Sequence, residues 1–433
     1  MGRLHYARRV GSIRSSVVGG KGLYAALIAL VIVVGTGLAG ATPIVDAVSH
    51  RAVTDATLIT PVSYDLLAPI CNTLDVLSLL SLRQHIALFL TLIAVMLVWR
   101  TIVHRRDRTR WTRELRSGVL AFVVWLAVYA GGVLVPRPMA AIKLYDPDDI
   151  AVDFHSHTNS SWDGRHSFTP ERNRAWHTGA GFSVAYISDH KSLVGARRGG
   201  AGNASTPNGQ TILLPALESR DHHEHVIVIG VDTTAAVDAK GEWHDPGGDT
   251  ALAYRLRAPF LILTIPGNIV TLTPNEERGV ARVLAIELSD AAPRGLNQIQ
   301  RDERGILELA DRLHLAVVAG SDNHGWGSTA AAWSVMHIPG WIRMRPSQLD
   351  SAIQWTIREQ GRSAVRVYLR HAPNPGTSRA ALAVTFPAIV WCMLVDMSWP
   401  ERSGWIIWIC VVVLLAYTYY SIWPRTKKAT EAN

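Results

Sequence analysis

Long apolar runs are confined to the two ends of this chain, and a polar middle segment separates them. Five stretches have lengths close to the roughly 20 residues that a helix needs to cross a bilayer. They are 22–41, 86–103, 117–135, 380–397 and 404–423. The sequence therefore predicts an N-terminal membrane region over 1–147, a soluble domain over 148–371 and a C-terminal membrane region over 372–433.

This segregation also explains the composition. The chain is 48% hydrophobic and only 18% charged, which is unusual for a soluble protein unless apolar residues gather in blocks. The stretch 62–82 contains Asp65 and Asp75, which favours an interfacial or re-entrant segment. The first apolar run also has features of a signal peptide, because basic residues precede it and Ala39-Gly40-Ala41 resembles a cleavage site.

The net charge of +8 comes largely from two stretches beside apolar runs, Arg3–Lys21 and Arg105–Arg116. Because basic loops stay in the cytoplasm, they predict a multi-pass protein of the cytoplasmic membrane with an extracytoplasmic domain. The basic tail Arg425–Lys428 argues the opposite, since five spans that start inside end outside. The basic runs flank apolar stretches and show no aromatic interleaving of the kind that stacks on bases, so we expect no nucleic-acid partner.

In the middle segment, short runs rich in Val, Ile and Leu alternate with helix-like segments, which predicts an α/β fold with parallel strands. The predicted strands are 150–155, 183–188, 211–217, 225–231, 260–265, 282–288 and 315–320. Thr169 as N-cap and Pro170 at the first helical position predict a helix that ends at Gly179. Further helices are expected over 303–314 and 346–360.

Polar residues with metal-binding side chains stand at the ends of the predicted strands: Asp153, His155, His157, Asp189, His190, Glu218, Asp322 and His324. His225 instead opens its strand. The carboxyl ends of the strands of a parallel barrel converge on one face, so we expect these side chains to meet there. The two-residue spacing from Asp153 to His157 also puts three side chains on one side of a strand.

The middle segment contains no cysteine, so any metal there must be held by His, Asp and Glu. Nitrogen and oxygen ligands of this kind suit divalent Zn, Mn or Fe, and the sequence does not choose among these metals.

Several short motifs occur in a specific order: Asp153-Phe-His-Ser-His-Thr158, Ser161-Trp-Asp163-Gly164, Ile187-Ser-Asp-His190, Glu218, His225, Glu287 and Gly320-Ser-Asp-Asn-His324. They resemble the motifs of the PHP family, the polymerase and histidinol phosphatase metallo-phosphoesterases, over about 150–340. The resemblance implies a distorted seven-stranded (β/α), TIM-like barrel that holds up to three metal ions.

The resemblance also implies a role for individual residues. His155, His157 and Asp322 would bind a first metal ion, and Glu218 would bridge it to a second ion that His225 also binds. A third ion would be held by Asp163, His190 and His324.

One position departs from the family pattern. Where the family commonly has His-Pro, this chain has Ile265 in the stretch Leu263-Thr-Ile-Pro-Gly267. An aliphatic side chain cannot bind a metal. The second site is therefore expected to be weak, completed by His222 or His223, or absent, which leaves two ions in place of three.

Together these features predict a membrane-anchored phosphoesterase that uses metal-activated water. Arg165 and Arg220 adjoin metal-binding candidates and are expected to contact phosphate, with His324 as a further candidate catalytic residue. The expected substrate is a phosphorylated small molecule, glycan or lipid. Two alternatives are a metal-dependent amide or C–N hydrolase built on the same barrel and a non-catalytic sensor of a metal or phospho-ligand, which Ile265 motivates.

Overall fold

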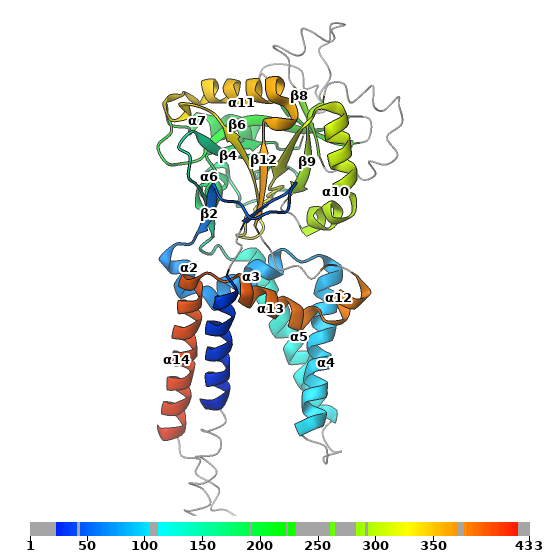
Figure 1. Ribbon diagram of the computed structural model, residues 1–433, viewed down its shortest axis with the longest axis vertical. Helices are drawn as coiled ribbons and strands as arrows, with labels where there is room; N and C mark the ends of the chain where they lie inside the picture. Colours follow the sequence, from blue (N-terminus) through cyan, green and yellow to red (C-terminus); the bar gives the residue numbers. More distant parts are fainter. Residues whose placement is uncertain are drawn as a thin grey trace, which may run out of the picture.

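The computed structural model describes residues 23–40, 44–103, 111–190, 192–221, 224–230, 260–264, 283–290, 293–370, 376 and 378–422. An α/β part stands on a base of helices, and the long helices of this base extend away from the α/β part in one direction (Figure 1).

A mixed ten-stranded sheet in the described residues has the strand order β1-β12-β11-β4-β5-β6-β7-β8-β9-β10. In chain order its strands are β1 (Ile44–Asp46), β4 (Asp149–Ser156), β5 (Val184–Ile187), β6 (Ile212–Asp221), β7 (Glu224–Ile229), β8 (Phe260–Leu263), β9 (Val283–Asp290), β10 (Ala316–Gly320), β11 (Ala332–His337) and β12 (Arg366–Arg370). A separate antiparallel pair is formed by β2 (Ala56–Ile59) and β3 (Ala141–Leu144).

The predicted α/β class is confirmed, and β4 to β10 match the seven predicted strands in order. All eight residues of β4 are buried, and its apolar side chains belong to two clusters, with Ile150, Val152 and Phe154 in one and Ala151 in the other. The helices of this part are α6 (Pro170–Ala180), α7 (Val194–Ala201), α10 (Pro293–Leu313) and α11 (Pro346–Gln360). Thr169 caps α6 as predicted, since its side chain accepts a hydrogen bond from the Arg172 N–H.

The sheet differs from the expected parallel barrel at β7, which is antiparallel to both β6 and β8. β6 ends at Asp221 and β7 begins at Glu224, so only two residues connect them. A parallel connection needs a crossover of a dozen or more residues, whereas a hairpin needs two. The chain therefore has to reverse direction here.

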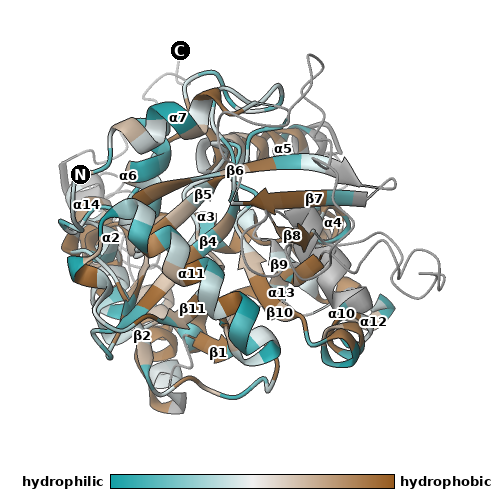
Figure 2. Ribbon diagram, turned by 90° about the horizontal axis from the view of Figure 1, so that it is seen from above, coloured by the Kyte–Doolittle hydropathy of each residue, from teal (hydrophilic) through white to brown (hydrophobic). Residues whose placement is uncertain are grey.

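The sheet curls until its last parallel strand lies beside β4. The Ser321 and Asp322 N–H groups donate to the His155 carbonyl at 3.1 and 2.8 Å, and the His157 N–H donates to the Asn323 carbonyl at 3.0 Å. Seen from above, the strands surround a common centre and α11 lies across the near end (Figure 2). Residues 321–323, which follow β10, thus connect this side of the sheet to β4, more than β10 itself does.

The sequence did not predict the three strands on the other side of β4. β11 pairs antiparallel with β4 and β12, and β1 pairs with β12. The side chain of Asp55 accepts hydrogen bonds from Tyr368 and Arg366 on β12. The segment 44–59 therefore belongs to the α/β part, so the predicted boundary at residue 148 falls after the first strands of this part.

The base contains four short helices, α2 (Val62–Leu66), α3 (Ala68–Ser78), α12 (Arg379–Ala383) and α13 (Thr385–Asp396), and the long helices α4 (Leu82–Val103), α5 (Trp111–Leu134) and α14 (Trp399–Ile422). A further helix spans Leu23–Thr36. Two stretches of the described chain are helices long and apolar enough to cross a membrane by length and composition, Arg116–Leu134 and Trp399–Thr418.

The predicted membrane span over 380–397 is wrong. This stretch forms α12 and α13, of five and twelve residues, and both are shorter than the roughly 20 residues that a crossing needs. α13 lies across the base, between the α/β part and the outer ends of the long helices (Figure 1). Thr385 begins α13 within the apolar run, and Met397 ends it with extended backbone.

A buried carboxylate connects this base to the α/β part. Asp75 of α3 accepts hydrogen bonds from the Tyr64 and Thr329 hydroxyls, each at 2.8 Å, and from Arg370 Nη1 at 2.6 Å. It also forms an ion pair with Arg137. Arg370 ends β12 and Thr329 lies between β10 and β11, so one side chain holds three parts of the chain together.

Candidate metal centre

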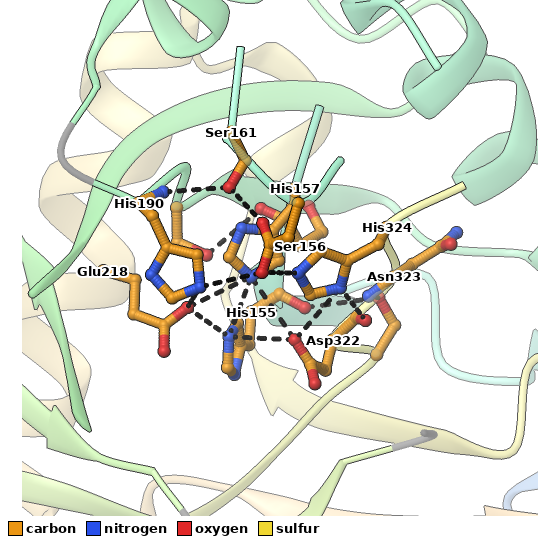
Figure 3. Close-up of polar contacts among 12 residues, drawn as sticks. His155, Ser156, His157, Ser161, His190, Glu218, Asp322, Asn323 and His324 are labelled. Atoms are coloured by element: carbon orange, nitrogen blue, oxygen red, sulfur yellow. Dashed lines mark hydrogen bonds and ion pairs between the residues drawn. The ribbon is translucent and has the colours of Figure 1, made fainter. Parts of the chain in front are cut away.

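Histidine and carboxylate side chains gather at one end of the curled sheet (Figure 3). Figure 3 labels His155, His157, His190, Glu218, Asp322 and His324 in this cluster. His225 opens β7, and because β7 runs antiparallel to β6 its first residues lie at the end of the sheet where β6 finishes. The reversal of β7 therefore explains how a residue at the start of a strand joins residues at strand ends.

The first predicted ligand set lies together. The Nε2 atoms of His155 and His157 are 3.1 Å apart, and Asp322 Oδ1 lies 3.4 and 3.3 Å from them. All three residues are buried. Asp322 has a φ of 43°, in the left-handed region that aspartate tolerates better than most residues. This local conformation directs a carboxylate toward two imidazoles.

Glu218 lies between several histidines. Its Oε2 atom is 3.2 Å from the Nε2 atoms of both His155 and His157 and 3.4 Å from His190 Nε2. Its Oε1 atom contacts His225 Nδ1. A carboxylate with one oxygen on each side of a histidine cluster has the geometry of a bridging ligand, which is the role implied by the resemblance.

The third predicted set is also assembled. Asp163 Oδ2 lies 3.1 Å from His324 Nε2 and 3.3 Å from His190 Nε2. A ring nitrogen of His157 also lies within 4.8 Å of the ligand atoms of Asp163, His190 and His324. His157 thus belongs to two of the groups, and its buried Nδ1 atom has no hydrogen-bond partner among the described residues.

Asp153 does not point into this cluster, although it shares a two-residue spacing with His155. Its Oδ1 atom accepts the N–H groups of His155 and Ser321, and its Oδ2 atom lies 2.7 Å from His177 Nε2. The carboxylate therefore holds the backbone of β4 against the segment after β10.

Glu287 of β9 is the residue whose role sequence reasoning missed, although its motif was recognised. Both of its carboxylate oxygens lie 3.3 Å from His155 Nδ1, while His155 Nε2 faces His157. A carboxylate on the far nitrogen of a metal-binding histidine fixes its tautomer and orientation. His177 gave no sequence signal, because helix α6 brings it to Asp153 only in the folded chain.

The imidazole rings and the carboxylates of the centre shift one another's pKa values. Burial disfavours the protonated imidazole, yet the neighbouring carboxylates, Glu287 first, hold the pKa of His155 well above its ordinary value. For His157, hydrogen bonds to Asp322 and Glu218 overcome burial and raise the pKa to about 9. Burial opposes ionisation of Glu218, but the charge of His155 holds its pKa far below the ordinary value.

The buried carboxylates thus require positive charge at the centre of the cluster. Divalent cations supply such charge, and histidine nitrogens with carboxylate oxygens are ligands that Zn, Mn and Fe accept. The donor set therefore fits divalent metal ions, and the residues do not select one metal.

Other residues that the sequence predicted for the site either lie outside the histidine cluster or fall outside the residues that the structure describes. Arg165 Nη1 donates to the carbonyls of Leu134 and Gly325, at 3.2 and 3.5 Å, and the guanidinium lies over the Trp326 ring. The backbone of Arg220 pairs with His225 in the ladder. Ile265, His222 and His223, and the side chain of Arg220, fall outside the described residues.

No protein-family model matches this chain, and none of the curated proteins matches it. PsfC from Pseudomonas syringae is 16% identical over 56% of this chain and 96% of PsfC, with a TM-score of 0.35. An amidohydrolase from Chromobacterium violaceum, with bound sulfate and no metal, is 15% identical over 46% of this chain and 96% of its own, with a TM-score of 0.29.

A protein from Bifidobacterium adolescentis, described as a metal-dependent phosphoesterase, is 15% identical over 40% of this chain and 87% of its own, with a TM-score of 0.26. Identities and TM-scores this low do not assign a family to the chain.

Proposed function

We propose that this chain is a membrane-anchored, metal-dependent phosphoesterase of the PHP type. The observation that carries the proposal is the position of Glu218, whose carboxylate contacts His155, His157, His190 and His225 at once. Four residue groups of the described chain are able to hold a metal ion, and three of them contain the three ligand sets implied by the ordered motifs. Geometry and motif order thus support the same assignment independently.

Each part of the centre has a task in this proposal. Bound divalent ions lower the pKa of water and polarise a phosphoryl oxygen. Glu218 and Asp322 would be among the ligands of these ions, and Glu287 keeps His155 oriented. A cavity of about 540 Å³, lined by Asp163, Asp322 and His324, leaves room for a substrate. Arg220 remains a proposed phosphate contact, together with His324 as a catalytic residue, whereas Arg165 Nη1 is engaged by the Leu134 and Gly325 carbonyls.

The arrangement of helices supports an extracytoplasmic domain. The helix Leu23–Thr36, α4, α5 and α14 extend from the base in the same direction (Figure 1). Their far ends adjoin the three basic stretches of the sequence, residues 3–21, 105–110 and 425–428. Among the described helices, only α5 and α14 contain stretches long and apolar enough to cross by themselves, and Leu23–Thr36 and Leu82–Val98 are shorter apolar helices. If these two also cross, the four crossings place all three stretches on one side, which satisfies the positive-inside rule without the conflict that five crossings create.

Full-length protein, reconstituted with Mn, Zn or Fe, tests the activity. We expect phosphate release from a generic phosphomonoester or phosphodiester, and loss of that release in His155→Ala and in Asp322→Ala. His50→Ala is the matched control, because the side chain of His50 is 64% exposed and lies outside the centre. Turnover retained in both ligand variants overturns the assignment.

The same preparation separates the alternatives. Release of ammonia or an amine from amide substrates, without release of phosphate, identifies a C–N hydrolase. Binding of phosphate compounds without turnover of any ester identifies a sensor.

A further inference from the structure

The cavity beside the candidate metal centre is enclosed jointly by the α/β part and by the helices of the base. Its volume is about 540 Å³. It is lined by Asp163, Asp322 and His324 of the centre and by Leu79, Tyr129 and Val133 of the base. The reactive end of the sheet therefore faces the long helices, and α11 lies on the opposite end of the α/β part (Figure 1).

A second cavity of about 760 Å³ borders the first. Val133, Trp176 and Gly327 line both cavities, and the second continues along apolar side chains such as Met139 and Phe168. The space next to the centre is thus continuous with apolar surface. A purely polar substrate has no use for such surface, whereas an amphiphile gains about 25 cal/mol for each Å² of apolar area that it buries.

Hydrogen bonds fix the end of α5 to the loop that carries His324. The Gly327 N–H donates to the Val133 carbonyl at 2.9 Å, and Arg165 Nη1 donates to the Leu134 carbonyl at 3.2 Å. These contacts use carbonyl groups that the last turn of a helix leaves without a partner. The membrane-facing helix and the candidate centre are therefore held at a fixed separation.

An aromatic stripe runs along α5 to the same cavity. The rings of Phe122, Trp125 and Tyr129 stack at successive centroid distances of 6.0 Å, and Phe89 of α4 packs 4.9 Å from Phe122. Only 6% of the stretch Arg116–Leu134 of α5 is buried inside the protein, so most of the apolar surface of this helix is free to contact lipid. Tyr129 both ends the stripe and lines the cavity.

Two exposed tryptophans lie on the base and a third lies beside the centre, whereas Trp355 is 55% exposed on α11, which lies at the opposite end of the α/β part (Figure 1). Trp391 on α13 is 60% exposed, Trp399 at the start of α14 is 54% exposed, and Trp326 is 52% exposed. Tryptophan is enriched at the boundary between hydrocarbon and water. Trp326 is two residues from His324, so the candidate centre lies close to the lipid headgroups when α5 and α14 cross the bilayer.

We infer that the centre acts on a phosphate ester carried by a membrane lipid, whose headgroup enters the cavity while its acyl chains stay along α5. This inference rests on the proposed phosphoesterase function and on the membrane anchor. One helical turn separates Tyr129 from Val133, about 6 Å along the axis. Both of these residues line the same cavity as Asp322, so a lipid headgroup beside this turn of α5 borders the space next to the candidate centre.

The test compares esters that share a phosphate group and differ only in acyl chains. Full-length, metal-loaded protein in phosphatidylcholine vesicles receives either phosphatidic acid or glycerol 3-phosphate, and either phosphatidylglycerol or its deacylated diester. We expect kcat/KM for one lipid to exceed that for its soluble partner by about tenfold or more, which is the size of effect that an apolar pocket provides.

A bulky substitution in the cavity supplies the second measurement. Val133→Trp is expected to reduce the ratio of lipid to soluble kcat/KM by about tenfold, because it fills the space between α5 and the centre. Val128→Trp is the matched control, since Val128 is 37% exposed on the same helix and outside the lining of either cavity. Its ratio should equal that of the wild type.

The outcomes separate this inference from the proposed function. Hydrolysis of the soluble esters at rates equal to or above those of the lipids overturns the lipid substrate and leaves the phosphoesterase intact. Equal loss of both activities in Val133→Trp likewise overturns it. If none of the four esters is hydrolysed, the proposed function and this inference are both wrong.

Discussion

Gly320 packs directly against His155: a Cβ atom at position 320 would lie 2.3 Å from the Cβ of His155. The same atom would lie 2.2 Å from Oε1 of Glu287. Gly320 ends β10, and the following residues bond to the backbone of β4. The absence of a side chain therefore lets two strands approach closely enough for His155 and Asp322 to share one cluster.

Gly320→Ala should displace His155 and weaken metal binding. Forcing a methyl group into this contact costs about 1–3 kcal/mol of stability. We expect fewer bound metal ions per chain by elemental analysis and a lowered unfolding midpoint. Gly200→Ala on α7 is the control, because a Cβ there meets nothing within 4 Å. Normal metal content in Gly320→Ala would show that the close approach is dispensable.

The sequence predicted the strands well because β4 to β10 are short apolar runs between polar segments. It failed at β7: the predicted strands 211–217 and 225–231 leave only seven residues between them, too few for a parallel crossover, yet parallel strands were expected. It also missed β1, β2, β3, β11 and β12, of three to six residues. These strands pair with partners far along the chain, as β11 does with β4 and β1 with β12.

The residues of the candidate centre were accessible from sequence because each stands in a recognisable motif. The roles of Asp153 and Glu287 were not, since they are defined by contacts with His177 and His155 in the folded chain. The position of Arg165 against the end of α5 also depends on tertiary structure, because Leu134 lies 31 residues away.

Glu287→Gln should weaken metal binding without disturbing the fold. The amide retains an oxygen acceptor but removes the negative charge that orients and polarises His155. Loss of such an outer partner typically costs about 10- to 100-fold in metal affinity. Competition titration with a chelator measures this change. Glu308→Gln on α10, where the side chain is 64% exposed, should leave the affinity unchanged.

Asp75→Asn should loosen the junction between the base and the α/β part. The substitution leaves Arg137 and Arg370 with less negative charge at a buried site, and removing one partner of a buried pair costs about 3–5 kcal/mol. The unfolding midpoint of the full-length protein in detergent should fall at pH 7. Asp311→Asn, whose carboxylate is 65% exposed, should have little effect.

The effect of Asp75 should depend on pH in a defined direction. Burial alone would raise the pKa of Asp75, but the charges of Arg370 and Arg137 outweigh burial and hold it below 3.8, its ordinary value. A depressed pKa contributes stability that is complete above the unfolded value and is lost as the pH falls through the folded value. The difference between wild type and Asp75→Asn should therefore be constant from about pH 5 to 8 and shrink below 3.8. A difference that grows in acid would contradict this account.

The number of crossings predicts where the C-terminus lies. If α4, α5, α14 and the helix Leu23–Thr36 all cross the membrane, as proposed, the tail after α14 is expected in the cytoplasm, on the same side as the basic loop between α4 and α5. Green fluorescent protein fused after Asn433 should therefore fluoresce, and alkaline phosphatase fused there should be inactive, whereas alkaline phosphatase fused after Arg370 should be active. Five crossings require an active phosphatase at Asn433. That result would mean that 380–397 crosses the membrane and that the basic tail lies on the opposite side of the membrane from the other basic stretches.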